Sequence, residues 1–255
     1  MALNQFRLLR LNGGQVEGTA DDFICRLPAG VNGYADAQVD DYGLIGRQAR
    51  RGRFRWSPGV HLSAQAQFSH EQDSLVGTAG FGFWNAPFAD PTVRWPALPQ
   101  AVWFFFASPP SDLPLAAQGA GRGWFAATLD AGRKTAVPLA PLAPLILLLN
   151  RLPALERRLW PMVRQRLAIS YAPIPAAITD WHAYDLFWRP DGCAFAVDGQ
   201  TILETAHSPR GPLGLVCWLD NQYMVATKNG RFRAGTLPLP TAQWLRLRQL
   251  RINAL

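Results

Sequence analysis

Hydrophobic and polar residues alternate along much of the chain with a period of two, which is typical of half-buried β-strands. The clearest case is residues 61–69, where Leu62, Ala64, Ala66 and Phe68 share one face. Glycine, proline and aspartate separate the alternating segments, as expected at turns. These segments are residues 23–27, 34–39, 61–69, 77–85, 102–106, 123–129, 181–188, 193–197, 213–219, 223–227 and 244–252. So many short strands predict an all-β fold, an antiparallel sandwich of two sheets.

Residues 138–172 depart from this pattern and predict short helices. A solid apolar run at residues 145–149 is followed by apolar residues at spacings of three to five. Pro153 and Pro161 are typical of first helical turns, so we expect two or three helical pieces. The chain has 255 residues. We expect one domain, residues 1–255, that carries this helical insertion.

Three roles are open for the insertion: a cap on its own sandwich, a segment that docks on an anionic membrane, or a surface for oligomer formation. It is too short and too broken by proline to span a bilayer, which requires about 20 apolar residues. Arginines dominate its polar side. The residues assigned to this membrane or lid surface are Leu147, Leu148, Arg157, Arg158, Trp160 and Arg164. We expect it over or beside the mouth of the ligand-binding face.

Residues 181–199 contain the most informative motif. They read W-x-x-Y-x-x-x-W-x-P-D-G-x-x-F-x-V-D-G, two strands joined by a tight turn at residues 190–192 and followed by another at Asp198 and Gly199. The motif resembles the signature of concanavalin A-like lectins and glucanases, especially the laminarinase and lichenase group. The resemblance extends over roughly residues 77–252. It implies an antiparallel jelly-roll sandwich whose concave face binds polysaccharide.

The catalytic motif of the resembling glucanases is missing. In that group E-x-D-x-x-E lies on a strand upstream of the hairpin, because retaining hydrolysis needs two carboxyls that face one glycosidic bond. In this chain the corresponding strand, residues 102–106, contains no carboxylate. The four glutamates of the chain are dispersed. We therefore expect the fold without glucanase activity.

The candidate binding face is rich in aromatic and amide side chains. Indoles stack on sugar rings, whereas Asn and Asp bind hydroxyls, but the same aromatic residues also suit a hydrophobic ligand. The candidate ligand-binding residues are Trp84, Asn85, Trp103, Trp218, Asp220, Asn221 and Tyr223. We expect a non-hydrolytic binding protein for a hydrophobic small molecule or a glycan.

Two enzyme alternatives remain open. The first is a cyclase- or isomerase-like enzyme in which Asp220 or Asp185 moves a proton within the same cleft. The second is a divergent glycoside hydrolase. A structure that places Asp220 in a salt bridge on the outer surface would weaken the first alternative.

Charge and cysteine content add few constraints. The net charge is +7, and Lys134 and Lys228 are the only lysines among 25 basic residues. An arginine run at residues 47–55 lacks any nucleic-acid motif, so no nucleic-acid partner is expected. Three cysteines without C-x-x-C spacing predict buried free thiols, and four dispersed histidines predict no metal site. We expect no cofactor. The N-terminus lacks a signal-peptide pattern, which favours a cytoplasmic protein, peripheral at the membrane if the insertion docks there.

Overall fold

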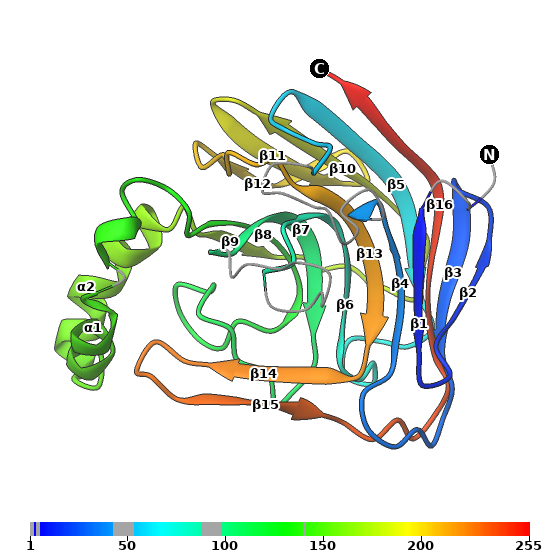
Figure 1. Ribbon diagram of the computed structural model, residues 1–255, viewed down its shortest axis with the longest axis horizontal. Coiled ribbons are helices and arrows are strands. Elements are labelled where there is room, and N and C mark those ends of the chain that lie inside the picture. The colour runs from blue at the N-terminus through cyan, green and yellow to red at the C-terminus, as the bar shows by residue number, and fades with distance from the viewer. Residues whose placement is uncertain (1–2, 4–5, 43–53, 88–97, 140) are drawn as a thin grey trace.

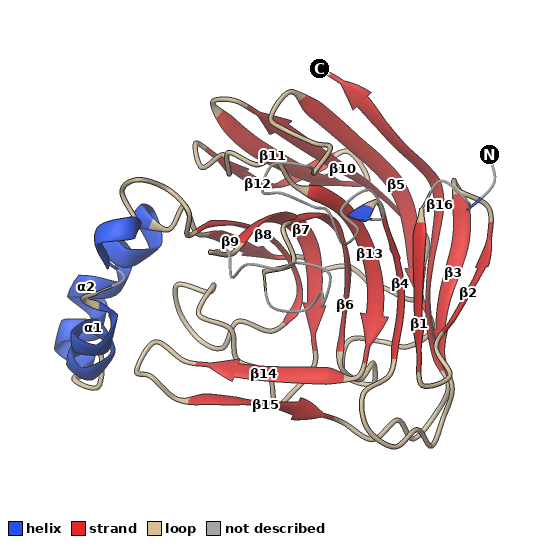
Figure 2. Cartoon of the chain, viewed as in Figure 1, coloured by secondary structure: helices blue, strands red, loops and turns tan. Residues whose placement is uncertain are grey.

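The computed structural model of the chain describes residues 3, 6–42, 54–87, 98–139 and 141–255, and shows two large antiparallel sheets packed face to face (Figures 1 and 2). Sheet A contains, in order, β1 (Arg7–Leu11), β4 (Asp36–Asp40), β13 (Gly214–Asp220), β6 (Thr78–Trp84), β7 (Gln100–Ala107), β8 (Gly123–Asp130) and β9 (Ser170–Pro173). Sheet B contains β12 (Gln200–Thr205), β11 (Gly192–Val197), β10 (His182–Arg189), β5 (Val60–Phe68), β16 (Gln243–Ala254), β3 (Asp22–Leu27) and β2 (Gln15–Gly18). A separate hairpin consists of β14 (Gln222–Ala226) and β15 (Phe232–Thr236).

The motif at residues 181–199 folds as predicted. Strands β10 and β11 pair in antiparallel register, with Trp188 opposite Cys193 and Tyr184 opposite Val197. Asp198 and Gly199 both have positive φ, 50° and 76°, the combination required by a two-residue turn between twisted strands. The expected all-β antiparallel sandwich of two sheets with a short helical insertion is confirmed.

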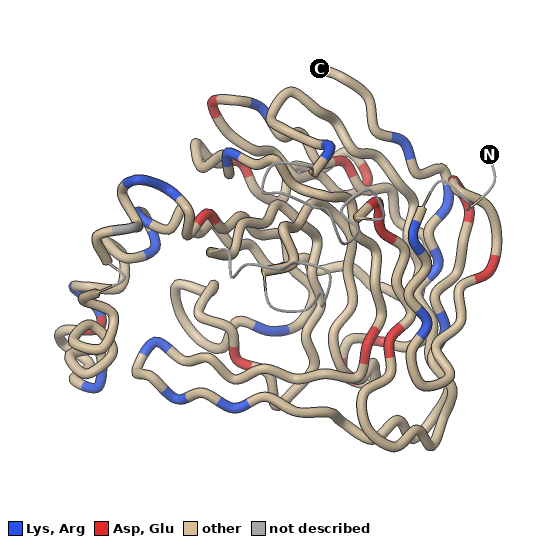
Figure 3. Tube along the Cα trace, viewed as in Figure 1, with Lys and Arg blue, Asp and Glu red and all other residues tan. Residues whose placement is uncertain are grey.

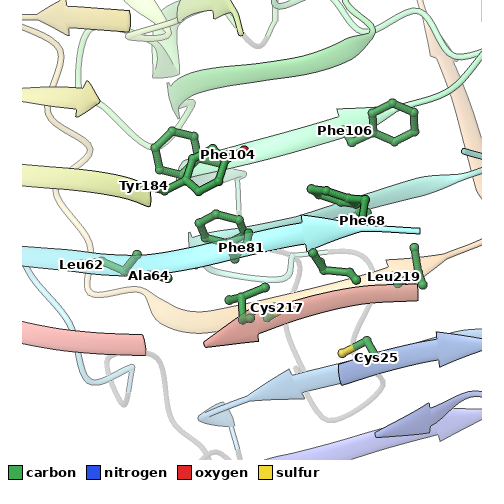
Figure 4. Packing of buried hydrophobic residues seen from close by; sticks show 14 of the residues in the cluster. Cys25, Leu62, Ala64, Phe68, Phe81, Phe104, Phe106, Tyr184, Cys217 and Leu219 are labelled. Atoms are coloured by element: carbon green, nitrogen blue, oxygen red, sulfur yellow. The ribbon is translucent and has the colours of Figure 1, made fainter. Parts of the chain in front are cut away.

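Aromatic rings from both sheets fill the space between them (Figure 4). Phe81 and Phe104 of sheet A contact Tyr184 of sheet B at ring-centroid distances of 5.4 and 5.0 Å. The buried indole of Trp124 donates a hydrogen bond to the Tyr184 hydroxyl, 3.2 Å away. As predicted, the three cysteines are buried and free. Burial raises the pKa of the Cys193 thiol to about 12, which keeps it protonated.

The insertion forms η3 (Val137–Leu139), α1 (Ala143–Leu149) and α2 (Pro153–Arg166), and the chain then enters β9. Pro153 occupies the first turn of α2 as expected, but Pro161 lies inside this helix and not in the first turn of another helix, where it was expected. Pro161 has no N–H, so the carbonyl of Arg157 has no donor within the helix. Both residues are exposed, so water can supply the missing hydrogen bond. No helix of the described residues has the length and hydropathy needed to cross a bilayer.

The helical pair lies beside the sandwich, next to β9 and the tip of the β14–β15 hairpin (Figure 1). Asn150 Nδ2 donates to the carbonyl of Lys228 at 2.9 Å, which attaches the helices to that tip. Trp160 is a correction to the predicted surface set: its side chain is buried against Leu139 and Val163. Arg164 is also turned inward in part, with a buried Nε.

Candidate functional site

The outer face of sheet A, which points away from sheet B, is the counterpart of the concave face predicted from the sequence. Alternate residues of β7 show how it arises: Phe104 belongs to the core between the sheets, while Trp103 and Phe105 belong to a second cluster on the outer face. The described side chains used to define this face are Asp36, Gln38, Asp40, Thr78, Trp84, Trp103, Phe105, Phe125, Trp218 and Asp220.

An aromatic cluster occupies the middle of this face. Trp103 contacts Trp84 at 4.5 Å between ring centroids, Phe105 at 5.0 Å and Trp218 at 5.6 Å. Thus three of the predicted ligand-binding residues, Trp84, Trp103 and Trp218, do lie together. Trp103 and Trp218 are each 7% exposed, whereas Trp84 is half-buried, so Trp84 is the most accessible indole of the three.

The glycines of β6 make room for these indoles. A β-carbon at Gly80 would lie 2.8 Å from Cη2 of Trp218, and one at Gly82 would lie 2.6 Å from the Cα of Trp103. The sequence suggested that these glycines let a ligand or another backbone approach. The structure shows that an indole ring and the neighbouring strand take the space.

No carboxylate lies on the strand where the resembling glucanases carry theirs. In β7 the outward-facing positions are occupied by Trp103 and Phe105, and their neighbours on the face are Trp218 and Phe125. Phe105 contacts the rings of Trp218 at 5.2 Å and of Phe125 at 5.3 Å. The middle of β7 therefore presents two buried aromatic rings to the outer face.

A pair of carboxyls lies at another place on the same face. Asp36 of β4 and Asp220 of β13 are directly opposite each other across the two strands. Side chains in such a pair are neighbours, with Cβ atoms about 5 Å apart. Both residues are buried, at 2% and 7% exposure. The pair was missed in the sequence, where only the polar alternation Asp36, Gln38, Asp40 signals an outward-facing acidic strand.

Burial shifts the protonation of both carboxyls. It raises the pKa of Asp220 to about 6. Burial and the nearby charge of Asp220 raise the pKa of Asp36 well above its usual range. Asp36 Oδ1 is buried and has no hydrogen-bond partner among the described residues. A hydrogen bond with the Tyr34 side chain acts in the opposite direction and favours the charged form of Asp36.

Hydrogen bonds connect the acid pair to the aromatic cluster. The Trp218 indole donates to Thr78 Oγ1 at 3.0 Å, and that hydroxyl donates to Asp220 Oδ1 at 2.8 Å. Asp220 Oδ1 also accepts the backbone N–H groups of Thr78 and Gln222 at 3.2 and 3.0 Å. Asp220 is therefore held rigidly at the edge of the cluster, and no described basic side chain forms an ion pair with it.

A second orphaned polar atom lies within the cluster itself. The Nε1 of Trp103 is buried and finds no acceptor in the part of the chain that the structure describes. A buried donor without a partner costs about 1–3 kcal/mol, so such groups point to a role that the protein's own hydrogen bonds do not fill. Phe54, Leu113 and Leu115 pack against the same cluster and shield it from bulk water.

The remaining predicted site residues serve the fold or lie elsewhere. Asn85 bonds the backbone of Leu98 and Gln100. Asn221 is fully buried and bonds the backbone of Gly33, Ala35 and Leu237. Both side-chain amides therefore already have hydrogen-bond partners within the fold.

Tyr223 and Asp185 also lie away from the cluster. Tyr223 belongs to the β14–β15 hairpin, whose pairing is separate from sheet A. Asp185 lies on sheet B, where it bonds His61 at 2.7 Å, so it takes no part in a cleft on sheet A. The arginine run of residues 47–55 falls mostly outside the described residues. Within the described ranges, no group of three or more His, Cys, Asp or Glu side chains is arranged to hold a metal ion.

Comparisons with known proteins reveal similarity in structure and none in sequence. No family model and no curated protein sequence matches the chain. Among solved structures, the chain is similar to a sialidase (7% identity, 99% of this chain, 17% of that chain, TM-score 0.46). It is also similar to the Emp47p carbohydrate recognition domain (8% identity, 98% and 89%, TM-score 0.48). A third is a GlcNAcα1-4Gal releasing endo-β-galactosidase from Clostridium perfringens (11% identity, 97% and 59%, TM-score 0.44). The chain spans less than a fifth of the sialidase, and likenesses this distant carry no information about function.

Proposed function

We propose that the outer face of sheet A binds a carbohydrate. The observation that carries this proposal is the position of the indoles of Trp84, Trp103 and Trp218 on the same face as the carboxyls of Asp36 and Asp220. Indole faces stack on the C–H surfaces of sugar rings, and carboxyl oxygens accept hydrogen bonds from hydroxyl groups.

The polar groups favour a sugar over a purely hydrophobic ligand. A hydrocarbon would cover Asp36 Oδ1 and Trp103 Nε1, which lack partners among the described residues, without giving either a hydrogen bond, and each such group would cost free energy. A sugar hydroxyl accepts from an indole N–H and donates to a carboxylate. Carbohydrate therefore satisfies the face that a hydrophobic molecule would leave unsatisfied.

The length of the face suits an oligosaccharide. Thr78 and Trp84 lie at opposite ends of β6. At about 3.3 Å per residue, the distance between them is about 20 Å. The aromatic cluster and the acid pair are spread along this length, and Trp84, the most accessible of the three indoles, lies at one end of it.

Binding measurements with single variants test the proposal. Isothermal titration against oligosaccharides of laminarin, lichenan, agarose, xyloglucan and alginate is expected to identify a ligand. Trp84→Ala should weaken it at least about tenfold, which corresponds to the loss of one stacking contact. Trp181→Ala is the matched control, because the Trp181 indole lies on the sheet B side. There it packs against Arg248, whose Cζ is 3.9 Å from the ring centroid. Equal weakening by both variants, or no binding to any sugar, would overturn the proposal.

The acid pair supports a second candidate, an enzyme that uses Asp220 as general acid or base. A pKa of about 6 suits proton transfer near neutral pH. Asp220 forms no ion pair on the outer surface, so the condition that would weaken this alternative is not met. Release of reducing ends from the bound polysaccharide by the wild type, and its loss in Asp220→Asn, would support an enzyme. Binding without release would support a binding protein.

A further inference from the structure

The helical insertion presents an unusual amount of apolar surface. Six of the 11 large hydrophobic side chains that are exposed in the described residues fall within residues 142–162. They are Leu142 (49%), Leu145 (52%), Leu147 (36%), Leu148 (55%), Leu152 (57%) and Met162 (40%). Helix α1 consists only of alanine, proline, isoleucine and leucine, and none of its residues is buried. A helix of this composition normally buries its side chains, so a surface outside the described fold is needed to cover it.

The charges around these leucines are almost all positive (Figure 3). Arg151, Arg157, Arg158 and Arg166 are exposed. The only acidic residue between residues 138 and 172 is Glu156, which lies 3.8 Å from Lys228 Nζ and is offset by it. We call this surface, the exposed leucines of residues 142–152 with Arg151, Arg157 and Arg158, the helical patch.

The positive charge of the helical patch favours an anionic partner. A second copy of the chain would bring the arginines of one helical patch toward those of the other, because a twofold interface pairs a surface with itself. An anionic bilayer instead offers phosphates to the arginines and acyl chains to the leucines. We propose that the helical patch docks the protein on an anionic lipid surface, lying in the interface without crossing the bilayer.

The remainder of the fold supports such a docking geometry. The helical pair projects to one side of the sandwich (Figure 2). Two contacts attach it to the tip of the β14–β15 hairpin. Asn150 donates a hydrogen bond to the carbonyl of Lys228. Leu147 packs close to Gly230, so that a β-carbon at Gly230 would lie 3.3 Å from Leu147 Cβ. Trp160 and Val163 of α2 are buried in a small cluster with Leu139. The exposed leucines therefore belong to helices that are packed against the rest of the fold.

Flotation with vesicles of phosphatidylcholine, alone or mixed with phosphatidylglycerol, tests this proposal on the full chain. Binding is expected only to the anionic vesicles and should fall as salt is added. Leu145→Ser/Leu148→Ser should lower the partition coefficient at least about tenfold, since two leucines lose their contact with acyl chains. Arg157→Glu/Arg158→Glu should lower it by about fivefold or more per residue and remove most of the salt dependence.

Two matched double variants serve as controls. Leu11→Ser/Leu255→Ser changes two leucines that are 38% and 57% exposed elsewhere on the molecule. Arg26→Glu/Arg251→Glu reverses two exposed arginines of sheet B. Neither should change vesicle binding, and unchanged thermal unfolding would show that all four variants fold. Equal binding to neutral vesicles, or no binding at low salt, would overturn the proposal; so would self-association of the wild type that Leu145→Ser/Leu148→Ser abolishes.

Discussion

The indole of Trp218 lies over Gly80 of the neighbouring strand, so that a β-carbon at position 80 would come within 2.8 Å of the ring. This contact sets the position of Trp218 on the outer face of sheet A. It also places the indole Nε1 where it reaches Thr78 and, through that hydroxyl, Asp220. Because position 80 has no side chain, Trp218 can link the aromatic cluster to the acid pair through Thr78.

Gly80→Ala is expected to displace Trp218. The added methyl group would meet the Phe104 carbonyl, with no room to relax, as well as the indole. We expect a loss of about 2 kcal/mol or more in unfolding free energy, and a changed near-UV circular dichroism spectrum. Gly119→Ala is the control, because its β-carbon meets nothing within 4 Å and it has positive φ, 69°; it should cost only about 1 kcal/mol. Equal losses for both variants would contradict this packing.

The acid pair predicts a pH dependence of stability. Burial raises the pKa of Asp220 from 3.8 to about 6, so its contribution is fully favourable below pH 4 and is lost as pH rises through 6. The unfolding free energy of the wild type, minus that of Asp220→Asn, should therefore fall between pH 4 and 7, by about 3 kcal/mol at most. Urea denaturation at several pH values measures this difference.

Asp198→Asn should give the opposite slope when the same experiment is extended below pH 4. Its hydrogen bond with His182 lowers the pKa of Asp198, so the stability it contributes is present at neutral pH and lost as pH falls. If the difference in unfolding free energy between the wild type and Asp220→Asn did not change with pH, the Asp220 carboxyl would have an ordinary pKa. That result would contradict the buried acid pair.

The ion pair of Arg7 and Asp40 borders the acid pair and should be important for stability. Arg7 contacts both Asp40 oxygens, at 2.9 and 2.8 Å, and Asp40 is fully buried. Arg7→Met leaves the carboxylate buried without its cation, which we expect to cost about 3 kcal/mol. Arg246→Met, which breaks an exposed pair with Asp22, should cost less than about 1 kcal/mol. Chemical denaturation of the two variants compares them, and similar losses would contradict the difference in burial.

The sequence predicted the central strands of both sheets and missed the edges. β1 and β9 border sheet A, β12 and β2 border sheet B, and none of the four was predicted. An edge strand pairs on one side only and often buries neither face fully, so the alternation that marks a strand fades. In β12, for example, no residue is fully buried. β15, in the exposed hairpin, was missed for the same reason.

The candidate site was predicted in part. Trp84, Trp103 and Trp218 followed from strand alternation and from the resemblance of the motif, whereas the pairing of Asp36 with Asp220 depends on strand register across the whole chain. The backbone hydrogen bonds of Asn221 could not be predicted, because an exposed amide and one that bonds backbone look alike in sequence. Its location after the end of β13, where turn backbone needs partners, explains the structural role.

The indole N–H signals of the ten tryptophans, followed by two-dimensional NMR during titration with the sugar that binds, test most directly whether the outer face of sheet A is the binding site. We predict shifts for Trp84, Trp103 and Trp218, with the largest at Trp103, whose Nε1 has no acceptor among the described residues and would donate to a ligand. Trp188, whose Nε1 donates to the Pro209 carbonyl in the core, should not move. Shifts confined to Trp181 on the sheet B side, with those of Trp103 and Trp218 unchanged, would contradict the assignment.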